Sequence, residues 1–315
     1  MRRFAVLATA VLFAAGAAAC GSSSKPAASS NPTTSIASGT SSPPTTSSTP
    51  TTQAKIDCSG TSAYVTDIGV PGAFKPVTPD TLTVVTSLPG PGFWVGSDND
   101  PAKVTSGYEY DIAKAMQQAF GLSKLVVRNE NFDSITAGSV TNYDVALSQV
   151  TINCKRAKVV KFTIPYFASN QGILVNKGTT VPDLATAKKI QWAVQSSTTA
   201  ADLLATIKPD HDPKVFQSLS DAYAALQAKQ VDAVLIDITI NLGEAQQSKG
   251  KFEVVGQFDI PSGPDNYGGI LPKGSTNGPA VNAVLKSLAD SGQLASFAAH
   301  SLGGDPGSVP VIKVP

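Results

Sequence analysis

The strongest constraint on the fold is a regular alternation of short β-rich runs with helical stretches beyond Pro79. Residues 82–85 (LTVV) have the composition of a strand. Residues 108–120 follow with the apolar spacing of an amphipathic helix that ends at Gly121. Such alternation is typical of α/β architecture, so the sequence predicts an α/β fold.

The alternation occurs in two series. The first continues with strands at residues 125–127 and 144–147. The second begins with an apolar run at residues 172–175 and contains three more strands and two helices, over residues 190–194, 199–207, 215–216, 220–229 and 231–236. Residues 269–272 then have the pattern of a strand that returns to the first sheet, and helices follow over residues 279–300.

The length of the globular part favours two lobes. About 250 residues remain once the N-terminal segments described below are set aside, which is more than one typical core contains. We expect lobe 1 to comprise residues 58–168 and 267–315, and lobe 2 to comprise residues 169–266. The chain then crosses between the lobes twice, near residues 168–171 and 262–266, and two short crossings form a hinge.

Residues 1–19 have the features of a signal peptide. Arg2 and Arg3 precede an apolar run, residues 4–15, that is too short to span a bilayer. The signal ends in AAAC, which resembles a bacterial lipobox except that Ala17 stands where Leu is commonest. We expect export and lipidation of Cys20, which would anchor the chain to the outer face of the cell membrane. Ordinary cleavage that leaves Cys20 unmodified is the alternative.

Residues 20–57 form a segment rich in Ser, Thr, Pro, Ala and Gly. Such a segment buries too little apolar surface to offset the entropy of ordering, so we expect a disordered tether. A flexible coil of this length reaches about 30–35 Å on average. The composition also suits O-glycosylation, which sequence alone leaves open.

The chain has three cysteines, and lipidation of Cys20 leaves Cys58 and Cys154 as an even pair in an oxidising compartment. We expect a disulfide, which by closing a loop of about 95 residues would stabilise the fold by about 4–5 kcal/mol. Two free buried thiols and half of a metal site are the alternatives. The chain has only His211 and His300 and no Cys-x-x-Cys spacing, so we expect no metal site.

The charge balance argues against nucleic-acid partners. Charged residues make up 15% of the chain, with 24 basic against 23 acidic side chains. Binding to phosphates needs clustered Lys and Arg, which this composition does not supply. We therefore expect no DNA or RNA partner.

Four segments, in order and spacing, resemble the motifs of the bacterial extracellular solute-binding proteins, family 3. They are GYEYDIA at 107–113, YDVALSQVTINCKR at 143–156 with FTIPY at 162–166, VDAVLID at 231–237, and YGGILPKG at 267–274. The resemblance extends from about residue 81 to residue 303. It implies a two-lobed, periplasmic-binding-protein-like (type II) fold with a two-crossing hinge. It also implies a monomer without a cofactor that binds a polar amino acid and delivers it to the permease of an ABC importer.

The resemblance places Arg156 and Asp237 at the ligand positions of the family. An amino acid is a zwitterion, so a desolvated site for it needs a cation for the carboxylate and an anion for the ammonium. Arg156, helped by Thr151, would bind the carboxylate, and Asp237 the ammonium. Without the resemblance, Arg156 would be interpreted as part of a solvated helix face and Asp237 as a helix N-cap.

Aromatic residues are expected to line the same cleft. Phe93 and Trp94 follow the first strand, and Phe132 follows the second, where the family usually has rings. Rings at these positions would stack on the aliphatic part of the ligand or complement its cation. Phe132 could equally belong to the core.

The remaining candidates are polar and suggest which side chain the ligand has. Gln149 belongs to the second motif, where the family has Gly, and Ser87 stands near a position at which members that bind basic or amide side chains often have Asp. Without that carboxylate a basic ligand would be left unpaired. Gln195 and Thr198 are the first and last residues of the run QSST, which stands where the family frequently has [KR]-x-G-[ST]. The missing Lys disfavours acidic ligands. A neutral polar amino acid remains.

Two other functions use the same fold. A sensory subunit would close on its ligand in the same way and then dock on a membrane kinase or receptor, and the sequence does not separate sensing from transport. A dehydratase-like enzyme would need a general acid or base in the cleft. The matched segments offer only Lys155 and Glu109 for that role, so we expect no enzymatic activity.

Overall fold

The computed structural model describes residues 57–58, 61–62, 65–96, 100–260 and 262–314. The expected signal peptide, the lipidation site Cys20 and nearly all of the expected tether lie outside these residues. None of the helices within them is both long and apolar enough to cross a membrane.

The first sheet has five strands in the order β4-β3-β5-β12-β6. These are β4 (Lys124–Asn129), β3 (Thr81–Thr86), β5 (Val145–Ala146), β12 (Asp265–Leu271) and β6 (Lys161–Ser169). β3 runs parallel to both of its neighbours, whereas β12 runs antiparallel to β5 and β6. This sheet forms lobe 1.

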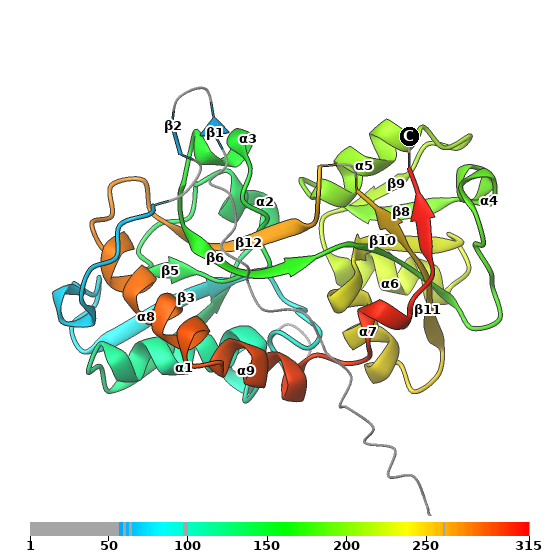
Figure 1. The fold of residues 1–315 in the computed structure, drawn as a ribbon. Coiled ribbons are helices and arrows are strands. Elements are labelled where there is room, and N and C mark those ends of the chain that lie inside the picture. The colour runs from blue at the N-terminus through cyan, green and yellow to red at the C-terminus, as the bar shows by residue number, and fades with distance from the viewer. Residues whose placement is uncertain (1–56, 59–60, 63–64, 97–99, 261, 315) are drawn as a thin grey trace, which may run out of the picture. The chain divides into compact units, whose positions relative to one another are not determined.

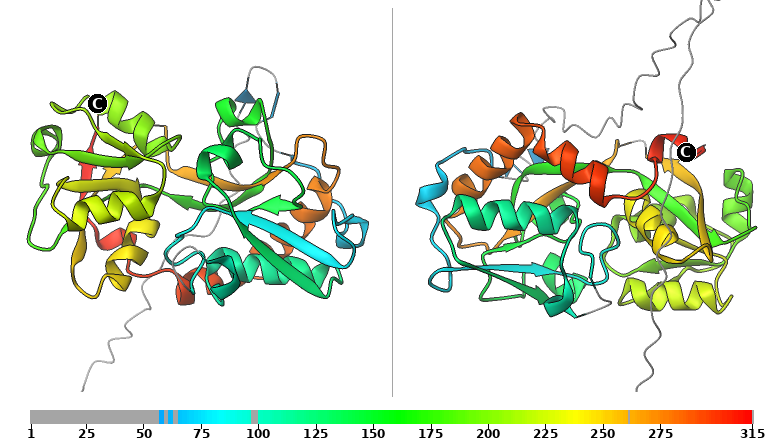
Figure 2. Two further views of the ribbon diagram at one scale, coloured as in Figure 1. Left: turned by 180° about the vertical axis from the view of Figure 1, so that it is seen from behind. Right: turned by 90° about the horizontal axis from the view of Figure 1, so that it is seen from below.

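Helices pack against this first sheet from several parts of the chain. Figure 2, seen from below, shows three of them side by side: α1 (Tyr108–Ala119), α8 (Gly278–Asp290) and α9 (Gln293–Ser301). The short elements of lobe 1 are α2 (Phe132–Thr136), α3 (Cys154–Ala157), η1 (Pro71–Ala73) and η2 (Pro101–Lys103). Leu82 and Val84 of β3 share one buried cluster with Ile112 and Met116 of α1, so the core lies between the sheet and this helix.

The second sheet has six strands in the order β13-β11-β7-β10-β8-β9 (Figure 1). They are β7 (Gln171–Asn176), β8 (Trp192–Gln195), β9 (Lys214–Phe216), β10 (Ala233–Asp237), β11 (Phe252–Asp259) and β13 (Val311–Lys313). The helices of this lobe 2 are α4 (Leu184–Lys189), α5 (Thr199–Ile207), α6 (Leu219–Gln227) and α7 (Ile238–Gln247). β7 is antiparallel to β10 and β11, whereas β8 is parallel to β9 and β10.

Three of the helices in lobe 2 begin at a side-chain cap. The side chains of Asp183, Thr198 and Ser218 each accept a hydrogen bond from a backbone N–H in the first turn of the helix that follows. Leu204 and Ile207 of α5 are buried, so its apolar spacing faces the core. α5 therefore occupies the range that the sequence predicted for it.

The chain crosses between the two sheets close to the expected positions. β6 ends at Ser169 and β7 begins at Gln171, while β11 ends at Asp259 and β12 begins at Asp265. The expected assignment of all of residues 267–315 to lobe 1 is wrong at its end. After η3 (Pro306–Ser308) the strand β13 pairs with β11 in the second sheet. A three-residue strand with one buried side chain, Ile312, is too short to show alternation, so the sequence pattern did not reveal it.

The expected disulfide is present between Cys58 and Cys154, whose Cα atoms are 5.2 Å apart. Cys58 ends β1 (Asp57–Cys58), which pairs with β2 (Thr61–Ser62). Cys154 is the first residue of α3, two positions before Arg156. The disulfide therefore fastens the N-terminal hairpin to the short helix that carries the expected ligand-binding arginine.

Candidate functional site

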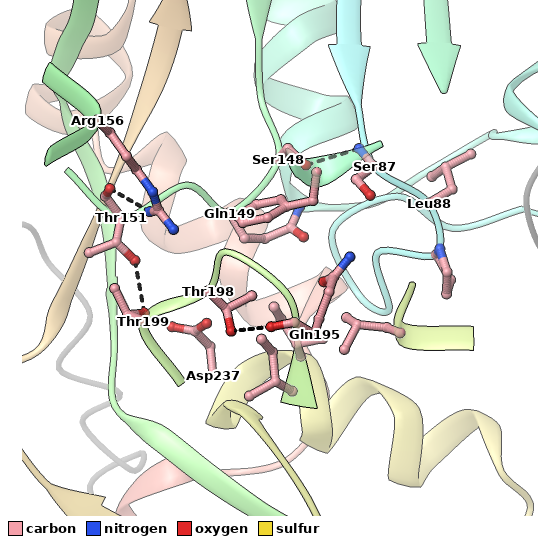
Figure 3. A pocket seen from close by; sticks show the side chains of 15 residues that line it. Ser87, Leu88, Ser148, Gln149, Thr151, Arg156, Gln195, Thr198, Thr199 and Asp237 are labelled. Atoms are coloured by element: carbon pink, nitrogen blue, oxygen red, sulfur yellow. Dashed lines mark hydrogen bonds between the residues drawn. The ribbon is translucent and has the colours of Figure 1, made fainter. Parts of the chain in front are cut away.

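Residues from both lobes line one small pocket, which we call the interlobe pocket (Figure 3). Lobe 1 contributes Ser87, Leu88, Pro89, Phe132, Ser148, Gln149, Thr151 and Arg156; lobe 2 contributes Gln195, Thr198, Thr199, Leu219, Ile236, Asp237 and Ile240. Its volume is about 20 Å³, which is roughly the space of one water molecule. An amino acid would fit only after the walls move apart.

The structure brings eight of the ten expected ligand-binding residues to this pocket, and does not bring Phe93 and Trp94. The eight are Arg156, Asp237, Thr151, Gln149, Phe132, Ser87, Gln195 and Thr198. Seven further lining residues were not expected from the sequence. They are mostly small or apolar residues next to the expected ones, and nothing in their sequence pattern distinguishes them from core positions.

Phe93 and Trp94 point elsewhere because of the turn that they occupy. Phe93 is fully buried and packs edge-on against Tyr108 and Phe167, with ring centroids 5.7 Å apart in each case. The indole Nε1 of Trp94 donates to the Glu109 carboxylate at 2.7 Å. Gly92, with a φ of +77°, reverses the chain between these residues and β3. The sequence showed a Gly- and Pro-rich loop but not the direction of its rings.

Arg156 is held at the pocket by its short helix and by both lobes. The side chain of Asn153 caps α3 by accepting a hydrogen bond from the Arg156 N–H at 2.9 Å. The Arg156 guanidinium lies over the Phe132 ring, 5.4 Å from its centroid, and is 6% exposed as a residue. Its Nη1 donates to the Thr151 carbonyl at 2.7 Å, and its Nη2 donates to the Ser197 carbonyl of lobe 2 at 2.8 Å.

Burial lowers the pKa of Arg156, and the nearby carboxylates of Asp265 and Asp237 oppose that effect. A guanidinium remains charged through any ordinary shift. Arg156 is thus a buried cation that is aimed at the pocket, rather than part of a solvated helix face.

Asp237 lies at the end of β10, at the N-cap position of α7, but its side chain makes no capping hydrogen bond. It is 4% exposed, and its Oδ1 makes no hydrogen bond with any described residue, although the Tyr267 hydroxyl lies close enough to act against the rise of its pKa. Burial and the neighbouring carboxylate of Asp265 raise its pKa well above the usual range. Figure 3 shows Asp237 and Arg156 facing the same space from opposite lobes. The N-cap interpretation therefore does not explain this residue.

Asp265, which no sequence motif indicated, is a second buried carboxyl group beside the pocket. It begins β12 at the second crossing and accepts hydrogen bonds from Gln171 Nε2 at 2.5 Å and Thr199 Oγ1 at 3.0 Å. Burial raises its pKa. Its sequence neighbours, SGPDN, have the composition of an exposed turn, so no sequence signal marked it as buried.

Glu109, the first acidic residue of α1, lies behind the pocket and is fully buried. Its Oε1 accepts hydrogen bonds from the backbone N–H of Gln149 at 2.8 Å and from the Tyr166 hydroxyl. Its Oε2 accepts from the Trp94 indole and from the side-chain amide of Gln149. Burial raises the pKa of Glu109 to about 7, and the hydrogen bonds from Tyr166 and Gln149 oppose the rise.

Neither candidate for a general acid or base lies at the pocket. Lys155 is exposed, and Glu109 already accepts four hydrogen bonds from the protein. In the part of the chain that the structure describes, no three or more His, Cys, Asp or Glu side chains gather as a metal ion would require. The lining residues are therefore suited to binding by charge and hydrogen bonding.

Direct contacts join the two lobes around the pocket. The hydroxyl of Ser196 in lobe 2 donates to the carboxylate of Asp133 in lobe 1, 2.9 Å from each oxygen. A Cβ atom added at Gly243 of α7 would come within 2.8 Å of the Pro91 backbone of lobe 1. Together with the bond from Arg156 to Ser197, these contacts describe lobes that are closed on each other.

Two α/β lobes, joined by strand crossings and facing a pocket with a buried guanidinium and a buried carboxyl group, define a two-lobed binding protein. The sequence profile of the bacterial extracellular solute-binding proteins, family 3, matches residues 82–303. The chain belongs to this family, whose members are binding proteins. The resemblance inferred from the sequence is confirmed.

Individual relatives agree with this assignment. The glutamine-binding protein GlnH of an ABC transporter from Bacillus subtilis is 28% identical over 205 residues, which cover 63% of this chain and 73% of the relative. The arginine-binding periplasmic protein of Mannheimia haemolytica is 28% identical over 201 residues, covering 63% and 82%. The structure of an ancestral arginine-binding protein bound to glutamine superposes with a TM-score of 0.61 at 25% identity, covering 72% of this chain and 100% of that one. The expected two-lobed fold is confirmed.

Proposed function

We propose that this protein is an extracytoplasmic receptor that binds a polar amino acid between its lobes and delivers it to an ABC importer. The observation that carries the proposal is a buried guanidinium and a buried carboxyl group that line one pocket, Arg156 from lobe 1 and Asp237 from lobe 2. A buried charge is costly unless it is paired, and a zwitterionic ligand pairs both. The amino-acid ligands named for the relatives support the same substrate class.

Ligand and lobe closure are coupled in this proposal. The ligand carboxylate would bind the Arg156 guanidinium on lobe 1, and its ammonium would bind the unpartnered Oδ1 of Asp237 on lobe 2. A ligand that contacts both lobes binds the closed form preferentially and therefore shifts the population toward closure.

The pocket walls favour an uncharged polar side chain. Apart from Arg156 and Asp237, every residue that lines the interlobe pocket is uncharged. Its hydrogen-bonding side chains include Ser87, Ser148 and Gln195. A third charge, on the ligand's side chain, would find no opposite charge on these walls, and the protein would discriminate against it.

Calorimetric titration of the twenty amino acids into the purified globular part tests the proposal. We expect one or a few polar amino acids to bind. In unfolding experiments, such a ligand at 100 times its dissociation constant should add about 2.7 kcal/mol to the free energy of unfolding. Arg156→Ala should weaken binding by at least about 2 kcal/mol, since one charge of the pair is lost. Arg128→Ala is the matched control, because Arg128 lies on β4, pairs with Glu130 and does not line the pocket. A folded Arg156→Ala protein with unchanged affinity would reject the site.

We also propose that Cys20 carries the lipid that anchors the receptor to the outer face of the membrane. Its support is the lipobox-like sequence at residues 17–20. Metabolic labelling with a palmitate analogue should label the natural chain and not Cys20→Ala. Uptake of the bound amino acid by cells that lack this protein then separates transport from sensing, because a purely sensory subunit would leave uptake unchanged.

A further inference from the structure

Gln149 has a backbone conformation that few residues with a side chain adopt. Its φ is +48°, in the left-handed region that favours glycine. The residue is 7% exposed and lines the interlobe pocket beside Ser148. A strained residue at a binding site needs a local stabilising interaction, and it is a reason to look for a role in function.

Glu109 supplies that interaction through two hydrogen bonds. The backbone N–H of Gln149 donates to Oε1, and its side-chain Nε2 donates to Oε2. Each of these oxygens also accepts a second bond, from the Tyr166 hydroxyl or from the Trp94 indole. The Trp94 indole and a backbone N–H can only donate, so both oxygens of Glu109 must act as acceptors.

This arrangement determines which end of the Gln149 amide is left for a ligand. With Nε2 bound to Glu109, the carbonyl Oε1 is the free end of a side chain that lines the pocket (Figure 3). No group among the described residues donates a hydrogen bond to this oxygen. Gln149 therefore offers the ligand an acceptor.

The side-chain amide of Gln195, on the opposite wall, also has its nitrogen bound within the protein and its oxygen free. Its Nε2 donates to the Gln217 carbonyl at 3.1 Å, within lobe 2. Its Oε1 likewise receives no hydrogen bond from any residue that the structure describes, and the residue is 5% exposed. The two amides thus present acceptors to the same pocket from both lobes.

We propose that Glu109 is a positioning residue that determines ligand specificity. It fixes the Gln149 amide with the carbonyl oxygen toward the pocket. This orientation selects amino acids whose side chain donates N–H hydrogen bonds without carrying a charge, namely carboxamides. The inference rests on the proposed amino-acid-binding function. A ligand with a carboxylate side chain would place a hydrogen-bond acceptor against the amide oxygens of Gln149 and Gln195. Buried polar groups left unpaired in this way cost binding free energy, so the site discriminates strongly against acidic amino acids.

The test compares glutamine with glutamate, which have nearly the same shape and differ in this donor and in charge, so the change of their affinity ratio between variants is the informative quantity. Among the twenty amino acids, we expect glutamine or asparagine to bind the natural protein most tightly, and glutamine to bind at least tenfold more tightly than glutamate. In Glu109→Gln the new amide can donate to Gln149, which permits the Gln149 amide to rotate. The ratio of the two affinities should then fall at least tenfold. A purely structural role would weaken both ligands equally and leave the ratio unchanged.

Two further variants make the outcome decisive. Gln149→Met keeps Glu109 itself but removes the acceptor from the pocket wall together with the amide donor to Glu109 Oε2. It should lower the ratio even if Glu109→Gln fails to fold. Glu130→Gln makes the same substitution directly after β4, away from the pocket, and should leave the ratio unchanged. A natural protein that prefers glutamate or a basic amino acid overturns the inference and the preference for an uncharged side chain, but not the proposed binding of a polar amino acid. A preference for an apolar amino acid overturns both. An unchanged ratio in both Glu109→Gln and Gln149→Met overturns the inference but not the proposed function. Failure of all twenty amino acids to bind overturns both.

Discussion

The buried carboxyl group of Glu109 should make the stability of this protein fall as the pH rises from about 5 to 7. Burial raises its pKa from 4.5 to about 7, and the residue is fully shielded from solvent. Below pH 4.5 Glu109 is protonated in both the folded and the unfolded protein. Between the two pKa values the unfolded chain has released the proton and the folded chain has retained it, so stability decreases with pH. The loss is complete above pH 7.

The size of the effect follows from the pKa shift. A rise from 4.5 to about 7 corresponds to a loss of about 3 kcal/mol across the interval. Urea unfolding at several pH values between 4.5 and 8 measures it directly. In Glu109→Gln, the free energy of unfolding should fall with pH by this amount less than in the natural protein. Asp237 and Asp265 are present in both proteins, so their contributions cancel when the two pH dependences are subtracted. Parallel curves for the two proteins would refute the reasoning, whatever their vertical offset.

Two further predictions concern the elements that hold the site. Removing the disulfide by Cys58→Ser with Cys154→Ser should lower the free energy of unfolding by up to about 4–5 kcal/mol. The double substitution should also weaken ligand binding, because Cys154 begins the helix that carries Arg156. Unchanged stability in urea would contradict this prediction. Gly243→Ala should weaken ligand binding and increase the radius of gyration measured by small-angle scattering, since its Cβ would lie 2.8 Å from the Pro91 backbone. Gly72→Ala, with nothing within 4 Å, is the control, and identical affinities for the two would contradict a role in closure.

The alternation of strands and helices was readable in the sequence because each element is long enough to show its period. The predicted helix over residues 199–207 matches α5, and the predicted strand over residues 82–85 lies within β3. β13 was not readable, because three residues show no period and its partner β11 is about fifty residues earlier in the chain. Pairing of that kind is decided by tertiary structure, which periodicity does not report.

The site was predictable to the extent that motifs carried it. Arg156 and Asp237 were expected from the positions they occupy in such motifs, and both line the pocket. The roles of Asp265 and Glu109 depend instead on burial, which a single sequence does not show for an isolated acid. Glu109 was noted only as a possible general acid or base of a dehydratase-like enzyme. Its four hydrogen bonds come from Trp94, Gln149 and Tyr166, at separations of 15 to 57 residues.

The closed arrangement of Arg156 explains why a ligand can favour closure without making it irreversible. Its two N–H groups donate to backbone carbonyls from different lobes, Thr151 and Ser197. A ligand carboxylate that enters the pocket must compete with these neutral acceptors for the guanidinium. Hydrogen bonds to an ionised acceptor are roughly twice as strong as those to a neutral one, so the exchange favours the ligand. When the lobes part and the ligand leaves, the Thr151 carbonyl of lobe 1 remains beside Arg156 and water replaces the Ser197 carbonyl of lobe 2, so the cation is not left unpaired at either stage.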